Sequence, residues 1–368
     1  MKTLVRCKIL LLVCLVLLTG CLQTRIIDEI AVIRTVGFDV DGEQGLNMTV
    51  SFPTFLEQGE QNVQERDVIN ANAETVKGAR ILLNEKSQKP LEFGQLNTLL
   101  IGEELAKRGV EDFIDSLYRD VSVGNRITLA LVDGKASEII SGDLSGGEQT
   151  GVYLSDLIQQ NMEMNTVPTT NMHEFLFSLY NDARDPFLPV LTIEDERIGI
   201  KGTALFKDDK YLRILNIDDS FILKLMTTPT KQTSKQFHLD MEEEESIVVL
   251  EKIFSKRKRS LDRSGSNPVY KIEIDIKGEI IDYTGKKNLE EENLVGEIEK
   301  VIEEKIAKRS KTLLEEFRDE GMDPVAVGEK YRSTTRDWQP QVWLDTIYQT
   351  VEFEVIANVE ILSSGAIE

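Results

Sequence analysis

The chain of 368 residues has only three cysteines, and two of them, Cys7 and Cys14, lie in its first 20 residues. If those residues are removed as a leader and Cys21 is modified, the remaining chain has no free thiol and no disulfide. A protein outside the cytoplasm could keep disulfides. The stability of this chain must therefore come from apolar cores, for which 41% hydrophobic residues are ample.

Basic residues are also few, since 43 lysines and arginines stand against 64 aspartates and glutamates, giving a net charge of −21. The first 20 residues hold three cations (Lys2, Arg6 and Lys8) and no acid, so the rest of the chain carries −24. A nucleic-acid-binding protein would show a basic stripe, and adhesion to an anionic membrane surface needs positive charge as well. The composition argues against both functions and is typical of a solvated acidic surface.

Motifs for catalysis and metal binding are missing too. Leu144–Gln149 is similar to the signature loop of ABC-type ATPases, but no phosphate-binding G-x-x-x-x-G-K-[ST] sequence accompanies it, which favours a flexible connector. His173 and His238 lack metal-ligand spacing, and no serine lies in the sequence context of a nucleophile elbow.

The two charged runs, Glu242–Glu245 and Lys256–Arg259, are both predicted to be exposed loops. For the basic run, the alternative is contact with lipid headgroups or an acidic partner. We expect no enzyme, no metal and no other cofactor.

The clearest positive feature is a short apolar run that ends in Leu18-Thr19-Gly20-Cys21. A positively charged segment precedes it, as in a signal peptide, and the run is shorter than the roughly 20 residues of a membrane-spanning helix. The tetrad matches the box of bacterial lipoproteins, in which the cysteine receives a diacylglycerol thioether and an N-acyl group after cleavage. A thiolate is the nucleophile that this chemistry needs. We predict that residues 1–20 are a signal peptide and that Cys21 anchors the chain to a lipid bilayer.

Strands and helices alternate in the first part of the remaining chain. The patterns predict a hairpin over 31–52, an exposed polar loop over 57–70, helices over 74–86 and 103–118, strands over 96–101 and 126–132, a glycine-rich loop over 141–151, and helices over 153–164 and 171–180. Thr170 or Asn171 could cap the last helix. We expect an N-terminal α+β domain over residues 21–140, followed by a connector and helical segment over 141–198.

The C-terminal domain, expected over residues 199–368, is dominated by one long helix predicted for about residues 290–320. Its apolar residues recur every three or four positions: Val295, Ile298, Ile302, Ile306, Leu313 and Phe317. Gly321 stands at the C-cap, while Glu299 and Lys300 are expected to face solvent. Because strands of alternating pattern flank this helix, we predict that it packs on an antiparallel sheet. The predicted fold class is α+β, a mixed α/β architecture of three domains with antiparallel-rich sheets and a long C-terminal amphipathic helix packed on a sheet.

Four segments in the same order resemble one family, the Ger(x)C spore germination lipoproteins. They are Glu29–Ile33 with Val36–Asp39, Phe93–Leu96 with Ile101–Gly109, Pro189 with Gly202–Lys210, and Asp323–Gly328 with Tyr331, Arg332 and Trp338. Two positions depart from the family pattern: Leu22 replaces the tryptophan that often follows the lipidated cysteine, and Tyr211–Ile214 lacks a glycine that is common there.

The resemblance implies a three-domain α+β protein on the outer face of the spore inner membrane. It would be one subunit of a nutrient germinant receptor, beside two integral membrane subunits, and required for the germination response. The family brings no catalytic residues, so the subunit would act through protein–protein contacts. The alternative is an extracytoplasmic solute-binding lipoprotein of a transporter, a class that usually shows two similar lobes of parallel strands around a deep cleft.

Overall fold

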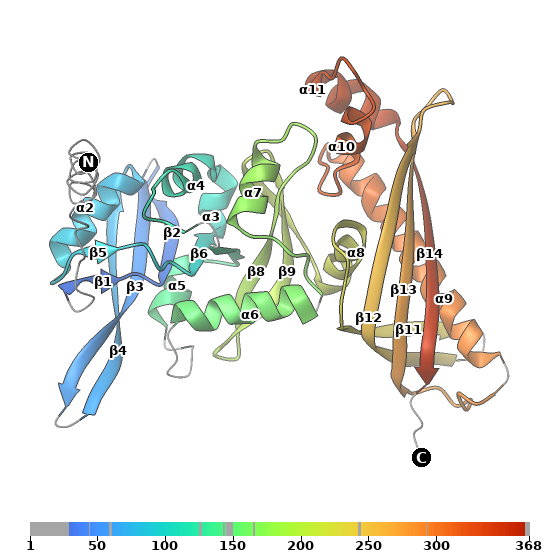
Figure 1. Ribbon diagram of the computed structural model, residues 1–368, viewed down its shortest axis with the longest axis horizontal. Helices are drawn as coiled ribbons and strands as arrows, with labels where there is room; N and C mark the ends of the chain where they lie inside the picture. Colours follow the sequence, from blue (N-terminus) through green and yellow to red (C-terminus); the bar gives the residue numbers. More distant parts are fainter. Residues whose placement is uncertain are drawn as a thin grey trace, which may run out of the picture.

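The computed structural model (Figure 1) describes residues 29–364, apart from 44, 59–60, 125–126, 143, 145–149, 165, 242–243 and 292. The described part contains an eight-stranded, a four-stranded and a two-stranded sheet. The predicted fold class, mixed α/β with antiparallel-rich sheets and a long helix packed on a sheet, is confirmed. Residues 1–20 and Cys21 lie outside the described residues, and no helix among the described ones is both long and apolar enough to cross a membrane.

The larger sheet has the strand order β10-β9-β8-β7-β6-β2-β3-β4. Its strands are β2 (Thr35–Asp41), β3 (Gly45–Gln58), β4 (Gln61–Ala73), β6 (Thr98–Gly102), β7 (Thr128–Val132), β8 (Phe187–Glu194), β9 (Arg197–Lys207) and β10 (Lys210–Leu215). The four central strands β2, β6, β7 and β8 are parallel, and the outer pairs are antiparallel. Beside this sheet, β1 (Ala31–Val32) pairs in parallel with β5 (Leu91–Glu92).

Helices cover both faces of the larger sheet. One face packs against α2 (Val76–Lys86), α3 (Glu103–Arg108), α4 (Glu111–Tyr118) and α7 (Met172–Leu179), and the other against α5 (Ala136–Ser141) and α6 (Thr150–Met164). Alternate residues of β6 accordingly enter different cores, with Leu99 and Ile101 on one side and Leu100 on the other. Burial on both faces is the usual condition of parallel central strands.

The predicted helices and strands of this part are confirmed, but the loop predicted over residues 57–70 is wrong. Strands β3 and β4 form a long antiparallel hairpin in which Gln58 pairs with Gln61 and Thr54 with Glu65. Backbone hydrogen bonds hold such a ladder together whatever its side chains are, so a polar hairpin at the edge of a sheet leaves no hydrophobic pattern to detect.

The four-stranded sheet has the order β11-β12-β13-β14. Its strands are β11 (Thr233–Met241), β12 (Glu244–Asp262), β13 (Val269–Tyr283) and β14 (Glu352–Ser364). The first three are antiparallel as predicted, but β14 runs parallel to β13. The antiparallel prediction is wrong for this pair because the long helix lies between the two strands in the sequence and returns the chain to the same end of the sheet.

The long helix α9 (Leu294–Asp319) lies along β14 and buries its predicted apolar stripe, including Ile298, Ile302 and Ile306, except for Val295, which is half-buried. It ends as predicted at Gly321, whose φ is +68°. The N–H of Met322 donates to the Phe317 carbonyl at 2.9 Å, and the N–H of Gly321 donates to that of Arg318 at 2.9 Å. This Schellman arrangement satisfies the last helical carbonyls with the one residue type that adopts a positive φ freely.

Glutamates on α9 also bond the edge of the sheet. Lys300 is exposed as expected, but Glu299 is not merely solvated, since its carboxylate accepts the Ile361 N–H at 2.7 Å. Glu303 accepts the Val359 N–H at 2.8 Å in the same way. Because β14 is an edge strand, these bonds satisfy N–H groups that would otherwise be open to another strand.

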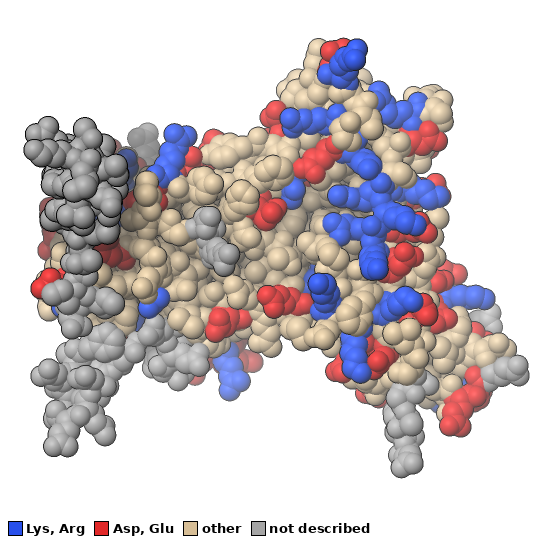
Figure 2. All heavy atoms as spheres, viewed as in Figure 1, with Lys and Arg blue, Asp and Glu red and all other residues tan. Residues whose placement is uncertain are grey.

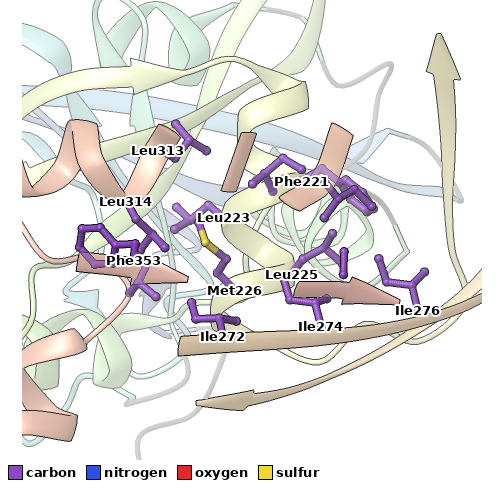
Figure 3. Close-up of a cluster of buried hydrophobic side chains, with 14 of the residues drawn as sticks. Phe221, Leu223, Leu225, Met226, Ile272, Ile274, Ile276, Leu313, Leu314 and Phe353 are labelled. Carbon is purple, nitrogen blue, oxygen red and sulfur yellow. The ribbon is translucent and has the colours of Figure 1, made fainter. Parts of the chain in front are cut away.

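Helix α8 (Ile217–Thr227) joins the two large sheets and is buried on nearly all sides. Figure 3 shows Leu225 and Met226 of α8 beside the isoleucines of β13, with Leu314 of α9 close by. The same core includes Phe187 of β8 and Leu205 of β9, so it continues into the larger sheet.

The predicted domain boundary at residue 199 falls inside β9. The division of the chain into domains at residues 140 and 198 stays a prediction.

Four short helical elements precede β14. They are α10 (Val327–Arg332), α11 (Pro340–Val342), the π-helix η2 (Trp343–Ile347) and the 3-10 helix η3 (Tyr348–Thr350). With the loop before α10, they lie at the end of the four-stranded sheet that faces α7 (Figure 1).

Candidate functional site

Two carboxylates, the half-buried Asp185 and the buried Asp323, join the parts of the chain that meet near α10. Asp185, between α7 and β8, accepts the N–H of Asp323 at 2.6 Å and that of Asp208 at 3.1 Å. Asp323 in turn accepts the N–H groups of Val327 at 2.9 Å and Gly328 at 2.7 Å, which caps α10. Burial raises the pKa of Asp185 to about 6 and that of Asp323 to about 7, and these N–H bonds oppose the shift.

An aromatic cluster follows the carboxylates. Trp343 is buried, stacks on Tyr348 with ring centroids 5.3 Å apart, and lies 4.8 Å from the ring of Tyr331. The Tyr348 hydroxyl donates to the Met322 carbonyl at 2.8 Å, and Trp338 covers the outer side of the cluster. This closing segment is therefore a packed structural unit rather than a set of reactive groups.

A polar cleft of about 400 Å³ lies beside this unit. The N-terminal end of α7, the C-terminal end of α8, the middle of β12 and the loop before α10 form its walls. Its lining includes Thr169, Asn171, Glu174, Arg184, Thr227, Thr228, Arg257, Arg259, Val325 and Glu329. Segments that are far apart in the sequence therefore bring three arginines and two glutamates to one hollow.

The three arginines of the cleft have different partners. The Arg184 Nη1 lies 3.6 Å from a carboxylate oxygen of Glu329, and the Arg259 Nη1 donates to the Val325 carbonyl at 2.9 Å. The side chain of Arg257 has no hydrogen-bond or ion-pair partner among the described residues, and its Nε is buried. Burial, together with the neighbouring charge of Arg259, lowers the pKa of Arg257 to about 10.

The loop predicted over Lys256–Arg259 is wrong, because these residues lie in the middle of β12 and pair with β13. Strand geometry divides the run, so Lys256 and Lys258 are exposed while Arg257 and Arg259 are half-buried on the other face. Because all four residues are charged, a hydrophobicity pattern does not show this alternation.

Figure 2 shows Lys and Arg gathered over β12, whereas uncharged residues cover most of the surface over α4 and α7.

A second hollow, of about 640 Å³, lies between α4, α7 and α10 and is mainly apolar. Three aromatic side chains on it, Tyr118, Phe177 and Tyr180, are each about half exposed. The Tyr180 hydroxyl donates to Asp115 at 3.1 Å, and the Arg184 guanidinium lies 5.5 Å from the centre of the Phe177 ring. We call this the aromatic groove. Exposed aromatics gathered in one place are typical of surfaces that bind another protein.

The structure does not bring the two histidines together. His173 lies at the rim of the aromatic groove, whereas His238 is exposed on β11. The described ranges contain no group of three or more histidine, cysteine, aspartate or glutamate side chains that could hold a metal.

Two runs singled out in the sequence are only partly described. Glu245 lies in β12, where it pairs with Asp240, so the predicted acidic loop is wrong at this residue. Glu242 and Glu243 lie outside the described residues. So do Ser145–Gln149, and the flexible connector there stays a prediction.

Residues of the opening motifs have structural roles. Asp39 is buried, and its carboxylate accepts the N–H groups of Ala136 at 2.7 Å and Ser137 at 2.9 Å, which caps α5. A Cβ on Gly102 would lie 2.2 Å from an Asp39 oxygen, so glycine is required for this close approach. The motifs therefore fix how helices join the sheet.

Comparisons with known proteins agree with this architecture. Residues 23–193 match the spore germination protein N-terminal domain, and residues 201–365 match the spore germination B3/GerAC-like C-terminal family. The mixed α/β fold with these two matched regions defines a spore germination protein. The chain belongs to the GerAC-like spore germination protein family, as the sequence resemblance predicted.

Alignments with named relatives cover nearly the whole chain. It is 32% identical to spore germination protein GerQC of Bacillus cereus, covering 98% of this chain and 99% of that one. It is 20% identical to spore germination protein KC of Bacillus subtilis (strain 168), covering 97% and 95%. The crystal structure of the GerBC protein matches with a TM-score of 0.58 at 16% identity, over 89% of this chain and 96% of that one, and so shares the fold.

Proposed function

We propose that this chain is a lipid-anchored subunit of a spore germinant receptor and is required for the germination response to nutrients. The acylated Cys21 holds it at the outer face of the spore inner membrane, beside two integral membrane subunits. It acts through protein–protein contacts rather than catalysis. Membership of the GerAC-like family, with relatives that align end to end, supports this proposal.

The aromatic groove is the observation that carries the proposal of action by contact. Phe177 and Tyr180 are 50% and 53% exposed, although aromatic side chains gain most from burial. They stand beside Tyr118 on a surface that Figure 2 shows to be poor in charge over α4 and α7. Aromatic anchors in a concave patch commonly supply most of the binding energy of an interface. We infer that an integral membrane subunit covers this groove.

The alternative, a solute-binding lipoprotein, fits the architecture less well. That class usually has two similar lobes that close on a solute between them. Here the two large sheets have eight and four strands, and α8 lies buried in a core that they share. Closure of one sheet on the other about a hinge would have to break this core.

The experiment compares two half-exposed apolar residues. Phe177, in the groove, and Leu212, on β10, are 50% and 48% exposed, so glutamate at either position disturbs the fold to a similar, small extent. Tagged wild-type, Phe177→Glu and Leu212→Glu proteins are purified from spore membranes, and the co-purifying integral membrane proteins are identified by mass spectrometry.

We expect Phe177→Glu to lose the membrane subunits and slow nutrient germination, because a buried, unpaired charge opposes association. Leu212→Glu should retain both properties, and both variants should melt like the wild type. Co-purification with Phe177→Glu at the wild-type level would exclude the groove as the contact. If no integral membrane protein accompanies even the wild-type chain, the receptor proposal is wrong.

A further inference from the structure

Arg257 lies on the half-buried face of β12, between Ser255 and Arg259 on the same face. Leu261 follows Arg259 on this face, and Arg257 itself pairs with the buried Ile274 of β13. Burying a guanidinium even in part has a cost, because its charge loses contact with water. An aliphatic residue would avoid that cost, so the position calls for another explanation.

The contacts of the cleft leave Arg257 available. Arg259 holds the loop before α10 through the Val325 carbonyl, and Arg184 lies beside Glu329, so each has a structural partner. Arg257 has none among the described residues, and the buried Nε atoms of Arg257 and Arg184 both lack an acceptor. The two Nη atoms of Arg257 also lack an acceptor but are not buried, so they can donate to a molecule in the cleft.

We propose that this cleft binds a small molecule through a carboxylate group held by Arg257. The planar guanidinium offers two parallel N–H donors, which match the two oxygens of a carboxylate. Arg184 and Arg259 add positive charge, and the N-terminal end of α7, capped by Asn171, adds the positive end of a helix dipole. This inference does not depend on the proposed receptor function.

The charges of the lining favour a carboxylate over a phosphate. Three arginines face Glu174 and Glu329, so the side chains sum to one positive charge, which suits a monoanion better than a dianion. The volume of about 400 Å³ is within the range of small-molecule sites.

The rest of the cleft offers acceptors. The hydroxyl of Thr227 donates to the Leu223 carbonyl at 2.7 Å, and that of Thr228 donates to the Lys224 carbonyl at 3.4 Å. Each hydroxyl oxygen can therefore still accept a bond. With the glutamates, these oxygens would suit a ligand that carries a hydroxyl or amino donor away from its carboxylate.

The test is calorimetric titration of the full-length protein in mild detergent. The probes are sodium 4-hydroxybenzoate and sodium phosphate, each at an ionic strength held constant with sodium chloride. The proteins are the wild type, Arg257→Gln, Arg257→Lys and the matched control Lys256→Gln. Lys256 is the neighbour of Arg257 on the same strand and carries the same charge, but it lies on the opposite, exposed face.

We expect wild type and Lys256→Gln to bind 4-hydroxybenzoate saturably at one site with equal affinity. Arg257→Gln should weaken binding at least about tenfold, because a charge-assisted bond is lost. Arg257→Lys keeps the charge and the fold but loses the planar fork, so it should also bind more weakly. Thermal melting confirms that each variant is folded, and Arg257→Lys carries the test if Arg257→Gln is not.

Three results would overturn the proposal. One is no saturable binding of 4-hydroxybenzoate by the wild type. Another is equal affinity in the wild type and the Arg257 variants. The third is binding of phosphate that is stronger than binding of 4-hydroxybenzoate and depends on Arg257. That result would assign the cleft to a phosphate instead.

Discussion

Replacing Ile302 by alanine tests the packing of α9 most severely. Ile302 is fully buried in the core that α9 shares with α8 and the four-stranded sheet. The change removes three carbons, and at about 0.8 kcal/mol per buried methylene-sized group the lost transfer free energy is about 2.4 kcal/mol. The cavity left behind adds to this, so we expect a loss of about 2–5 kcal/mol. Against a total of roughly 5–15 kcal/mol, this loss could unfold the C-terminal part.

Urea unfolding of the chain from Leu22 onward measures this loss. Both tryptophans, Trp338 and Trp343, pack on the same core as Ile302, so their fluorescence reports unfolding of this part of the molecule. The matched control is Lys300→Ala on the exposed face of α9, which should change stability by less than about 0.5 kcal/mol. An Ile302→Ala midpoint equal to the wild type, with impaired receptor assembly, would instead mean that the stripe docks on another subunit.

Three further changes test the loops and caps. Asp39→Ala should cost about 1–3 kcal/mol, because two N–H groups at the start of α5 lose their acceptor; an unchanged urea midpoint would contradict the cap. Gly328→Ala should cost about 1–3 kcal/mol, because the new Cβ would lie 2.7 Å from the Trp343 Nε1; unchanged stability and tryptophan emission would refute this. Burial raises the pKa values of Asp185 and Asp323 to about 6 and 7, so the folded chain keeps protons that the unfolded chain releases above about pH 4. Their contribution to stability therefore falls as pH rises from about 4 to 7, and Asp323→Asn should flatten this dependence; identical slopes would show that Asp323 does not titrate in this range.

Periodic patterns in the sequence predicted those helices and strands that bury only one face. The stripe of α9 corresponds to one buried face. The alternating strands predicted to flank it include β13, which buries Ile272, Ile274 and Ile276 on one face. Gly321 was predictable at the end of α9 because the Schellman turn needs a positive φ, which glycine adopts most easily.

Features set by long-range contacts were not predictable from local patterns. The parallel direction of β14 depends on the path of the chain across α9, which alternation does not encode. The polar end of the β3–β4 hairpin is paired along its backbone, and backbone pairing gives no signal in a hydrophobicity pattern. The cleft was missed because Arg257 and Arg259 alternate with Lys256 and Lys258 within one charged run. Its other walls come from α7, α8 and the loop before α10.

The measurement that most directly tests the central claim, a subunit tethered at the membrane, uses spores that produce either the wild type or Cys21→Ala. The thiol of Cys21 is the only group in the predicted box that can form the thioether, so mass spectrometry should find a diacylglycerol thioether on the wild-type residue. Two acyl chains should then hold the wild type in the membrane fraction through a high-salt wash. Cys21→Ala should be unprocessed or released, and nutrient germination should fail. Salt-resistant membrane retention of Cys21→Ala with germination at the wild-type rate would contradict the account.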